Sequence, residues 1–298
     1  MKRYEPTVSI IVPAYNEEKH IRKCLDSLMA IDYPKEKLEI IVVDNCSTDK
    51  TREIVAGYPV RLIVENKRNA SAARNTGILA AGGKIILNTD ADCVADSRLV
   101  KEIVKPFADD GITGVGGKIE SAAPETPAQE YAEKAHVLDQ KDVFLKTMRP
   151  GFIQTANAAY RKKALMEIGL FDEKLRNCSD SDIAYRLQWA GHKIVLGEKA
   201  VVRHIHRETI WQLYRQFYSY SRGRAGILAK HRKMLGKNYR IDLKKYFALA
   251  GMLFLAIPAL IFGKNSGEKL YPIYGAARWL GTITGTLQGA VENRMILI

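Results

Sequence analysis

Short apolar runs alternate with amphipathic segments along the first hundred residues. The runs are rich in β-branched residues, which is typical of strands buried in a sheet. The expected strands are residues 8–12, 38–43, 60–64 and 85–87. The expected helices between them are residues 21–28 and the alanine-rich segment 70–81, which ends at Gly82-Gly83. This alternation predicts an α/β fold whose mostly parallel sheet carries helices on both faces and binds ligands at the carboxyl ends of its strands.

The pattern after residue 100 is less regular. A strand is expected to end at residues 114–117, followed by a helix over 128–146, a strand over 152–160 and a short helix from Lys162. Two further helices are expected over residues 179–190, ending at Gly191, and over residues 209–233, which are basic and aromatic. A glycine directly after helical spacing is a common stop signal.

The last fifty residues differ in character from the rest. Residues 246–262 carry no charge, and at 1.5 Å per residue they extend roughly 26 Å, slightly less than a bilayer core. Residues 271–291 contain only Arg278 as a charge. Small residues recur there every fourth position: Ala277, Gly281, Gly285 and Gly289. This spacing lets helices approach closely in lipid. A membrane-entering hairpin is therefore favoured, and a water-soluble appendage or a hydrophobic dimer interface stays open.

Composition narrows the class of protein. The chain has 298 residues, is 47% hydrophobic and 27% charged, and is long enough to bury a sizeable core. Its four cysteines form no Cys-x-x-Cys pair, which indicates a reducing compartment. The apolar run near the N-terminus is too short for a signal peptide, so a cytoplasmic start is expected. Most of the net charge of +13 lies in residues 201–245, where twelve Lys and Arg face two acidic residues. Such a cluster suits nucleic acid, acidic substrates or an anionic membrane.

The segment Asp90-Ala91-Asp92 follows the last of the four early strands. Alternate side chains of an extended chain point the same way, so the two carboxylates can face one site. Adjacent carboxylates repel unless a cation or hydrogen-bond donors lie between them, and a hard divalent cation would suit the pair. Considered alone, two turn aspartates are the more frequent explanation.

Two common nucleotide-binding motifs are missing. The first strand ends in Pro13-Ala14-Tyr15-Asn16-Glu17, with no Gly-x-Gly-x-x-Gly, and no phosphate-binding loop of the Gly-x-x-x-x-Gly-Lys type occurs. The second strand ends at Asp44, whose carboxylate could accept hydrogen bonds from a base or ribose. The residues after it, Ser47-Thr48-Asp49, are by themselves better explained as a helix cap.

Six segments in order resemble the family 2 glycosyltransferases, which have the GT-A fold. They are VSIIVPAYNE (8–17), IIVVDNCSTDKT (40–51), ARNTG (73–77), TDAD (89–92), NAAYR (157–161) and SDSDIAYRL (179–187). The resemblance covers roughly residues 7–225. Each motif is weak alone, and the six together are specific. The implied fold is a Rossmann-like mixed sheet flanked by helices, here followed by C-terminal hydrophobic helices.

The resemblance implies a role for particular residues. Those on the side of the nucleotide-sugar are Pro13, Ala14, Tyr15, Glu17, Asp44, Arg74 and Asp90. Asp92 and His204 would complete the site of a divalent cation, Mg²⁺ or Mn²⁺. Asp180 matches the family's catalytic base, although Ser179 stands where the family usually has Glu. Asp182 would either support that base or act as the N-terminal carboxylate of its helix.

The expected activity is inverting, metal-dependent sugar transfer. The donor would be a UDP- or GDP-linked sugar, and the acceptor a lipid-linked carrier or saccharide at the cytoplasmic face of the cell membrane, where the basic cluster is favoured. Residues 1–233 would form the catalytic domain, with halves at 1–95 and 96–233, and residues 234–298 a membrane-associated hairpin that could also pair two copies. The alternatives are a catalytically silent membrane scaffold and a nucleic-acid-binding protein, for which no motif is present.

Overall fold

The computed structural model describes residues 4–147, 151–175, 177–235 and 243–295. The chain divides into two compact units. The first consists of Met1–Ala122 and Leu138–His204, and the second of Ala123–Val137 and Ile205–Ile298. This division groups residues by proximity alone, so the functional domain boundary expected near residue 233 stays a prediction.

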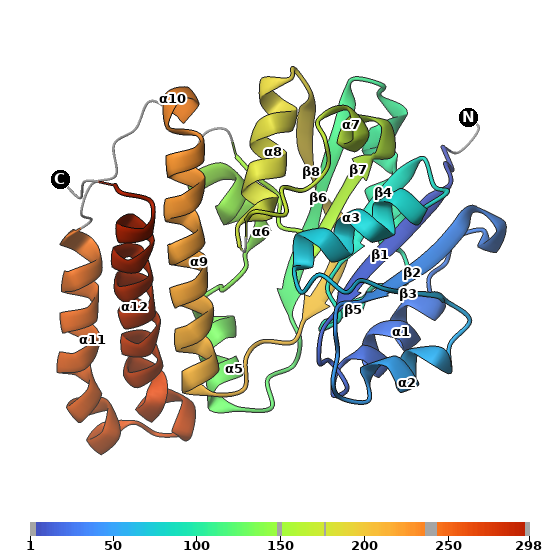
Figure 1. The fold of residues 1–298 in the computed structure, drawn as a ribbon. Coiled ribbons are helices and arrows are strands. Elements are labelled where there is room, and N and C mark those ends of the chain that lie inside the picture. The colour runs from blue at the N-terminus through green and yellow to red at the C-terminus, as the bar shows by residue number, and fades with distance from the viewer. Residues whose placement is uncertain (1–3, 148–150, 176, 236–242, 296–298) are drawn as a thin grey trace. The chain divides into compact units, whose positions relative to one another are not determined.

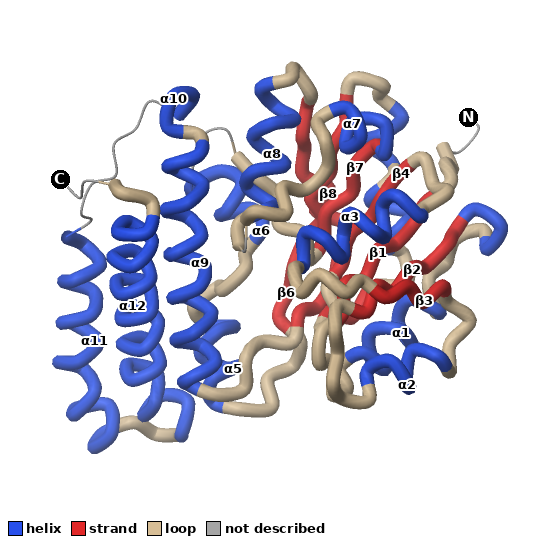
Figure 2. The backbone as a smooth tube through the Cα atoms, in the orientation of Figure 1, coloured by secondary structure: helices blue, strands red, loops and turns tan. Residues whose placement is uncertain are grey.

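The first unit contains one eight-stranded mixed sheet with the order β3-β2-β1-β4-β7-β6-β8-β5 (Figures 1 and 2). Its strands are β1 (Val8–Ala14), β2 (Leu38–Asp44), β3 (Arg61–Val64), β4 (Ile85–Thr89), β5 (Cys93–Ala95), β6 (Ile112–Ser121), β7 (Asn157–Arg161) and β8 (Lys193–His204). The strands β1 to β4 pair in parallel, β7 runs antiparallel to β4 and β6, and β5 runs antiparallel to β8. The four early strands and the mixed α/β sheet expected from the sequence are confirmed.

The strands bury both of their faces, which explains their continuous apolar runs. Ile10 of β1 belongs to one hydrophobic cluster and its neighbour Ile11 to a second one. The helical elements of the first cluster are α1 (Ile21–Met29), α2 (Thr51–Ala56), α4 (Leu99–Ile103) and η2 (Lys105–Ala108). Those of the second are α3 (Ala70–Ala80), α7 (Lys162–Glu167) and α8 (Ser179–Trp189). A short 3₁₀ helix, η1 (Lys35–Lys37), precedes β2. Helices on both sides leave the carboxyl ends of β1, β2 and β4 to form a site.

Two expectations for the middle of the chain are wrong. The helix expected over residues 128–146 is divided into α5 (Pro127–Lys134), α6 (Gln140–Asp142) and the π-helix η3 (Val143–Thr147). His136 and Leu138 have left-handed φ values of 48° and 69°, which a continuous right-handed helix cannot contain. The strand expected over 152–160 begins only at Asn157, where its pairing with β4 starts.

The second unit is helical. It contains α5, α9 (Ile210–Lys230), α10 (Arg232–Leu235), α11 (Leu243–Phe262) and α12 (Ser266–Glu292). Thr209 and Gln212 form a capping box that begins α9 where the sequence predicts it. Within this unit α12 packs against both α9 and α11.

The small-residue ridge has a different partner from the lipid-embedded helix that its spacing suggested. A Cβ added to Gly281, Gly285 or Gly289 would collide with the backbone of α9, at Tyr214, Tyr218 and Arg222 respectively. The ridge therefore lets two helices of the same unit approach at backbone distance. Contacts that advance by four residues on both helices also show that α9 and α12 run parallel.

The structure confirms two hydrophobic C-terminal helices, but they differ as membrane elements. Within the described part of the chain, one segment, Lys244–Phe262 of α11, has the length and apolar composition of a membrane span. The helix α12 does not meet that criterion. The expectation that both helices enter a bilayer therefore finds support for α11 alone.

Candidate functional site

The two aspartates after β4 have different environments. Asp90 is partly exposed and accepts a hydrogen bond from Nη2 of Arg74 at Oδ1, at 2.8 Å. Asp92 is buried, and its Oδ1 lies 3.4 Å from Nε2 of His204. The pair is thus divided between an arginine on one side and a histidine on the other.

Arg74 reaches Asp90 from the first turns of α3. Asn69 caps this helix, because its Oδ1 accepts from the backbone N–H groups of Ser71 and Ala72 at 2.7 and 3.2 Å. The Arg74 side chain is only 8% exposed. A buried guanidinium in a capped helix has little freedom to move, so Arg74 orients Asp90 at the carboxyl end of β4.

His204 is delivered to Asp92 by the pairing of two strands. In the antiparallel ladder of β5 and β8, His204 lies directly opposite Cys93, the neighbour of Asp92. The family resemblance had already assigned both residues to one cation site, and this strand pairing brings them together although they are more than a hundred positions apart. Carboxylate oxygen and imidazole nitrogen are both suitable donors for Mn²⁺.

The donor set for a cation is incomplete within the protein. Among the described residues, no group of three or more His, Cys, Asp and Glu side chains is arranged to hold a metal ion. Mg²⁺ and Mn²⁺ in phosphate-transfer sites commonly take one or two protein ligands and complete their shell with substrate phosphate oxygens and water. Asp92 and His204 fit such a shared site, and they do not form a self-sufficient one.

Asp180 lies in the first turn of α8. Burial raises the pKa of its carboxyl to about 6. The backbone N–H of Ser181, which donates to its Oδ1 at 2.8 Å, and the charge of Arg74 oppose this rise, whereas the charge of Asp90 adds to it. Asp180 is therefore electrostatically coupled to the Arg74–Asp90 pair, and its pKa is suited to accepting a proton near neutral pH.

Asp182, two residues after Asp180 in α8, has a structural partner. It forms a buried ion pair with Arg186 at 2.7 Å, and Arg186 also donates to the carbonyls of Ile168 and Leu170 at 2.6 and 2.5 Å. This arrangement ties α8 to the segment before it. Asp182 thereby supports the helix that carries Asp180.

The loop after β1 is joined to the loop after β2. Asn16 has a left-handed φ of 54°, its N–H donates to Oγ of Ser47 at 3.0 Å, and its Oδ1 accepts from the N–H of Thr48 at 2.8 Å. Glu17 donates its N–H to Oγ1 of Thr51 at 2.8 Å. Ser47 and Thr48 thus contribute loop-to-loop bonds, a role that the cap explanation from sequence did not include.

The remaining donor-side candidates lie along the same edge. Pro13 and Ala14 are the last two residues of β1, and the carbonyl of Ala14 accepts from the N–H of Asn45 at 2.8 Å. Tyr15 is exposed, and the guanidinium of Arg68 lies over its ring, 4.3 Å from the centroid, and also donates to its hydroxyl. A flat aromatic surface paired with a cation is suited to stacking with a nucleobase.

Asp44 is closed off by a residue that the sequence did not single out. Arg52 of α2 donates from Nε and Nη2 to Oδ2 of Asp44 at 2.9 and 2.8 Å, and the N–H of Ser47 lies 3.3 Å from the same oxygen. The Asp44 side chain is 1% exposed. Arg52 and Ser47 thus bond Oδ2, while the buried Oδ1 accepts no hydrogen bond from the residues that the structure describes.

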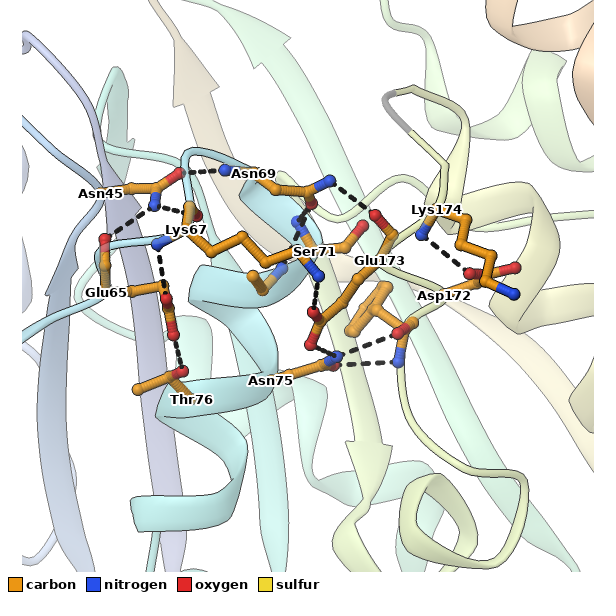
Figure 3. Close-up of polar contacts among 12 residues, drawn as sticks. Asn45, Glu65, Lys67, Asn69, Ser71, Asn75, Thr76, Asp172, Glu173 and Lys174 are labelled. Carbon is orange, nitrogen blue, oxygen red and sulfur yellow. Dashed lines mark hydrogen bonds and ion pairs between the residues drawn. The ribbon is translucent and has the colours of Figure 1, made fainter.

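A polar network connects these loops with the segment before Asp180 (Figure 3). The side-chain amide of Asn75 donates to the carbonyl of Phe171 at 2.9 Å and accepts from its N–H at 3.0 Å. Glu173 receives bonds from Asn75 at 3.0 Å and from Lys67 at 2.5 Å, and its carbonyl accepts from Asn69 at 2.8 Å. The same helix, α3, therefore holds Asp90 through Arg74 and the α7–α8 segment through Asn75.

These contacts were missed at the sequence level for a physical reason. Asn69, Asn75 and Glu173 are polar residues at loop and helix positions where such residues are common, and their partners lie about a hundred positions away. The only available signal was the position of Asn75 next to Arg74 within the ARNTG segment.

The family model for glycosyl transferase family 2 matches residues 9–169. The chain belongs to this family, and its sheet has the GT-A fold; it is a nucleotide-sugar glycosyltransferase. The matched residues include β1 to β4, Arg74 and both aspartates after β4, but they end before Asp180 and His204.

Relatives and solved structures extend the likeness. The glycosyltransferase AglE of Haloferax volcanii is 29% identical over 253 residues, which cover 82% of this chain and 79% of AglE. A dolichyl N-acetyl-α-D-glucosaminyl phosphate 3-β-D-2,3-diacetamido-2,3-dideoxy-β-D-glucuronosyltransferase of Methanococcus voltae is 26% identical over 75% of this chain and 74% of its own length. The mannosyltransferase PcManGT of Pyrobaculum calidifontis, solved with GDP-mannose and Mn²⁺, superposes with a TM-score of 0.62 at 23% identity, covering 98% of this chain and 88% of that one.

Proposed function

We propose that this protein transfers a sugar with inversion from a nucleotide-diphospho-sugar to a hydroxyl group of a lipid-linked acceptor at the cytoplasmic face of the membrane. The observation that carries the proposal is the placement of Asp180. Its carboxyl, with a pKa of about 6, is coupled to the Arg74–Asp90 pair at the carboxyl end of β4. This coupling supports a base that acts beside the donor-side residues at one end of the sheet.

The proposed step balances as a single displacement. The acceptor oxygen forms a bond to the anomeric carbon while its proton passes to Asp180. The bond from that carbon to the phosphate oxygen breaks on the opposite side, and its electron pair leaves with the nucleoside diphosphate. A positioned base contributes about 10²–10⁴-fold to such a rate. An acceptor that attacks through an ionised phosphate would need Asp180 less.

Asp92 and His204 would hold the divalent cation together with the diphosphate oxygens of the donor. The cation would offset the negative charge that develops on the departing nucleoside diphosphate. Arg74 orients Asp90 beside this charge, and Tyr15, Glu17 and the loops joined through Asn16 would enclose the nucleoside. The structure of PcManGT with GDP-mannose and Mn²⁺ supports use of a cation within this fold.

A lipid-linked acceptor is supported by two observations. The Methanococcus voltae relative is named for a dolichyl phosphate-linked substrate. The helix α11 of this chain leaves a large apolar surface exposed. The sugar, the nucleotide and the linkage are not distinguished by these observations, so donor identification is the first experiment.

A thermal-shift screen tests the proposal. UDP-, GDP- and dTDP-linked sugars are added to the purified protein with and without Mn²⁺. A ligand that binds the folded state alone stabilises it by RT ln(1 + [L]/Kd), so the donor should raise the melting temperature only with its metal. Asp92→Asn should abolish the metal-dependent part, and Asp96→Asn, a change at a partly exposed residue just after β5, should leave it unaltered. If the donor raised the melting temperature equally with and without Mn²⁺ in the wild-type protein and in Asp92→Asn, the assignment of Asp92 would be refuted.

A further inference from the structure

The helix α11 forms a closed hairpin with α12. Gly263 and Asn265 lie between the two helices. A Cβ added to Gly275 would collide with the side chain of Met252, and these two residues are at nearly equal distances along the chain from Gly263. Because α12 runs parallel to α9, α11 runs antiparallel to both. Figures 1 and 2 show these three helices side by side within the second unit.

The hairpin covers only a narrow stripe of α11. Met252 and the other half-buried positions recur at helical spacing and face α12. The rest of the circumference is apolar and open: Phe247, Phe254 and Phe262 are 76%, 79% and 81% exposed. An isolated apolar helix face of this size is uncommon on a monomeric soluble protein and marks an interaction surface.

The packing of α12 decides how such a helix can meet a bilayer. If α11 crossed the bilayer with the hairpin closed, the part of α12 that packs on it would lie at the same depth. Arg278 lies in that part of α12, three residues after the Gly275 that packs on Met252, and its guanidinium lies over the ring of Phe217. A charged group at that depth is strongly unfavourable. A helix that lies along the surface keeps Arg278 out of the hydrocarbon and still buries its outer face.

The charge distribution selects the type of membrane. The antiparallel arrangement places the start of α11 on the side toward which α9 runs. Lys244 and Lys245 begin α11, and Lys230, Arg232 and Lys233 lie further toward that side, at the end of α9 and in α10. Basic side chains beside an apolar helix face favour anionic headgroups.

We infer that α11 is an in-plane membrane anchor, whose outer face, including Phe247, Phe254 and Ile261, lies in the headgroup region of an anionic bilayer while its inner stripe stays on α12. The inference gives the proposed lipid-linked acceptor a physical location, and it rests on the proposed function only in that respect. Binding to lipid is tested without donor or acceptor.

Vesicle sedimentation of the full-length protein tests the surface. Vesicles of phosphatidylcholine with about one-third phosphatidylglycerol should bind the protein at least tenfold more tightly than pure phosphatidylcholine. Phe254→Asp should lower binding to the mixed vesicles by at least tenfold. Leu79→Asp, an equally simple change at a 58%-exposed apolar residue of α3, should leave binding unaltered. Circular dichroism and the donor-induced thermal shift show that each variant is folded and competent, so failure of donor binding is distinguished from failure of lipid binding.

A labelling experiment tests the orientation. The variants Lys244→Cys and Lys264→Cys, at exposed charged positions at the start of α11 and in the turn after it, are made in a background with Cys46 and Cys178 changed to serine and are treated with a membrane-impermeant maleimide outside the vesicles. An in-plane helix leaves both positions on the outer side, so both react. Reaction at position 244 with protection at position 264 would mean that α11 crosses the bilayer and would overturn the inference. The inference would also be overturned if the protein did not bind vesicles and instead formed a dimer that Phe254→Asp dissociates. The outer face of α11 would then be an interface with a second copy of the chain.

Discussion

Arg74 and Asp90 form an ion pair of 2.8 Å that joins the buried helix α3 to the carboxyl end of β4. The guanidinium also lowers the pKa of Asp180, which burial and Asp90 raise. One arginine thus acts on a donor-side carboxylate and on the proposed base. Its position in the helix interior, 8% exposed, makes the pair stronger than a surface salt bridge.

Replacing Arg74 should alter the pH dependence of transfer. In Arg74→Ala the charge that lowers the Asp180 pKa is absent, so the acid limb of the rate profile should move to higher pH. We expect a loss of at least tenfold in kcat/KM at pH 6.5 and a smaller loss at pH 8. The measurement is the pH profile of transfer with the donor found by thermal shift. Arg61→Ala is the control, because Arg61 lies in β3 and donates to the carbonyl of Ala80 at the end of α3. An unshifted acid limb would show that Arg74 does not act on the base.

Asp180 should reduce stability at neutral pH. Its folded-state pKa of about 6 lies above the ordinary aspartate value of 3.8, so the folded protein binds the additional proton between these values. Stability from this carboxyl is present below pH 4 and declines as the pH rises to about 6. Asp180→Asn should therefore increase the free energy of unfolding at pH 7.5 by about 1–3 kcal/mol, and should lower kcat at least a hundredfold.

The neighbouring Asp182 supplies the matched control for Asp180. Asp182→Asn breaks the buried pair with Arg186, which should cost about 3–5 kcal/mol at the same pH. Urea denaturation at pH 4 and 7.5 measures both variants. Equal destabilisation by the two substitutions would contradict the raised pKa of Asp180.

Asn75 should act on turnover more than on donor binding. Asn75→Ala leaves the N–H and carbonyl of Phe171 without their side-chain partner, which costs about 1–3 kcal/mol for each buried group. The α7–α8 segment that leads to Asp180 then loses the Asn75 part of its attachment to α3 and keeps the bond from Asn69 to the carbonyl of Glu173. We expect kcat to fall about tenfold or more while the KM for the donor changes little.

Thr76→Ala, on the same helix, is the control for Asn75. It removes a hydrogen bond to Glu65 at 2.5 Å and does not touch the α7–α8 segment. Steady-state kinetics and equilibrium unfolding, measured together, separate the two roles. A rise in donor KM with unchanged kcat would place Asn75 in donor binding instead.

Gly285 should tolerate no larger residue. In Gly285→Ala the new Cβ would collide with the Tyr218 backbone of α9, and overpacking of this kind costs about 1–3 kcal/mol. Gly251→Ala in α11 meets no atom within 4 Å and should stabilise its helix by up to about 1 kcal/mol. Thermal unfolding of both variants checks the contrast. Stabilisation by both substitutions would mean that α9 and α12 do not pack at backbone distance.

The sequence alone determined the parallel strands β1 to β4, the helices α3 and α8, and the candidate positions at the strand ends. Each of these depends on a local period or on a motif within a few residues, which is how strands and helices are encoded. The same locality explains the errors over residues 128–146, where two residues with left-handed φ divide an otherwise helical pattern.

Tertiary structure decided which partner each polar residue has. The pairing of β5 with β8 brings His204 to Asp92, α3 brings Asn75 to Phe171, and α9 receives the glycine ridge of α12. A spacing of four small residues is equally suited to lipid or to protein, and only the neighbour present selects between them. Contacts between residues a hundred positions apart depend on how the helices and strands pack. The local spacing of apolar residues, which predicts each helix or strand, does not determine that packing.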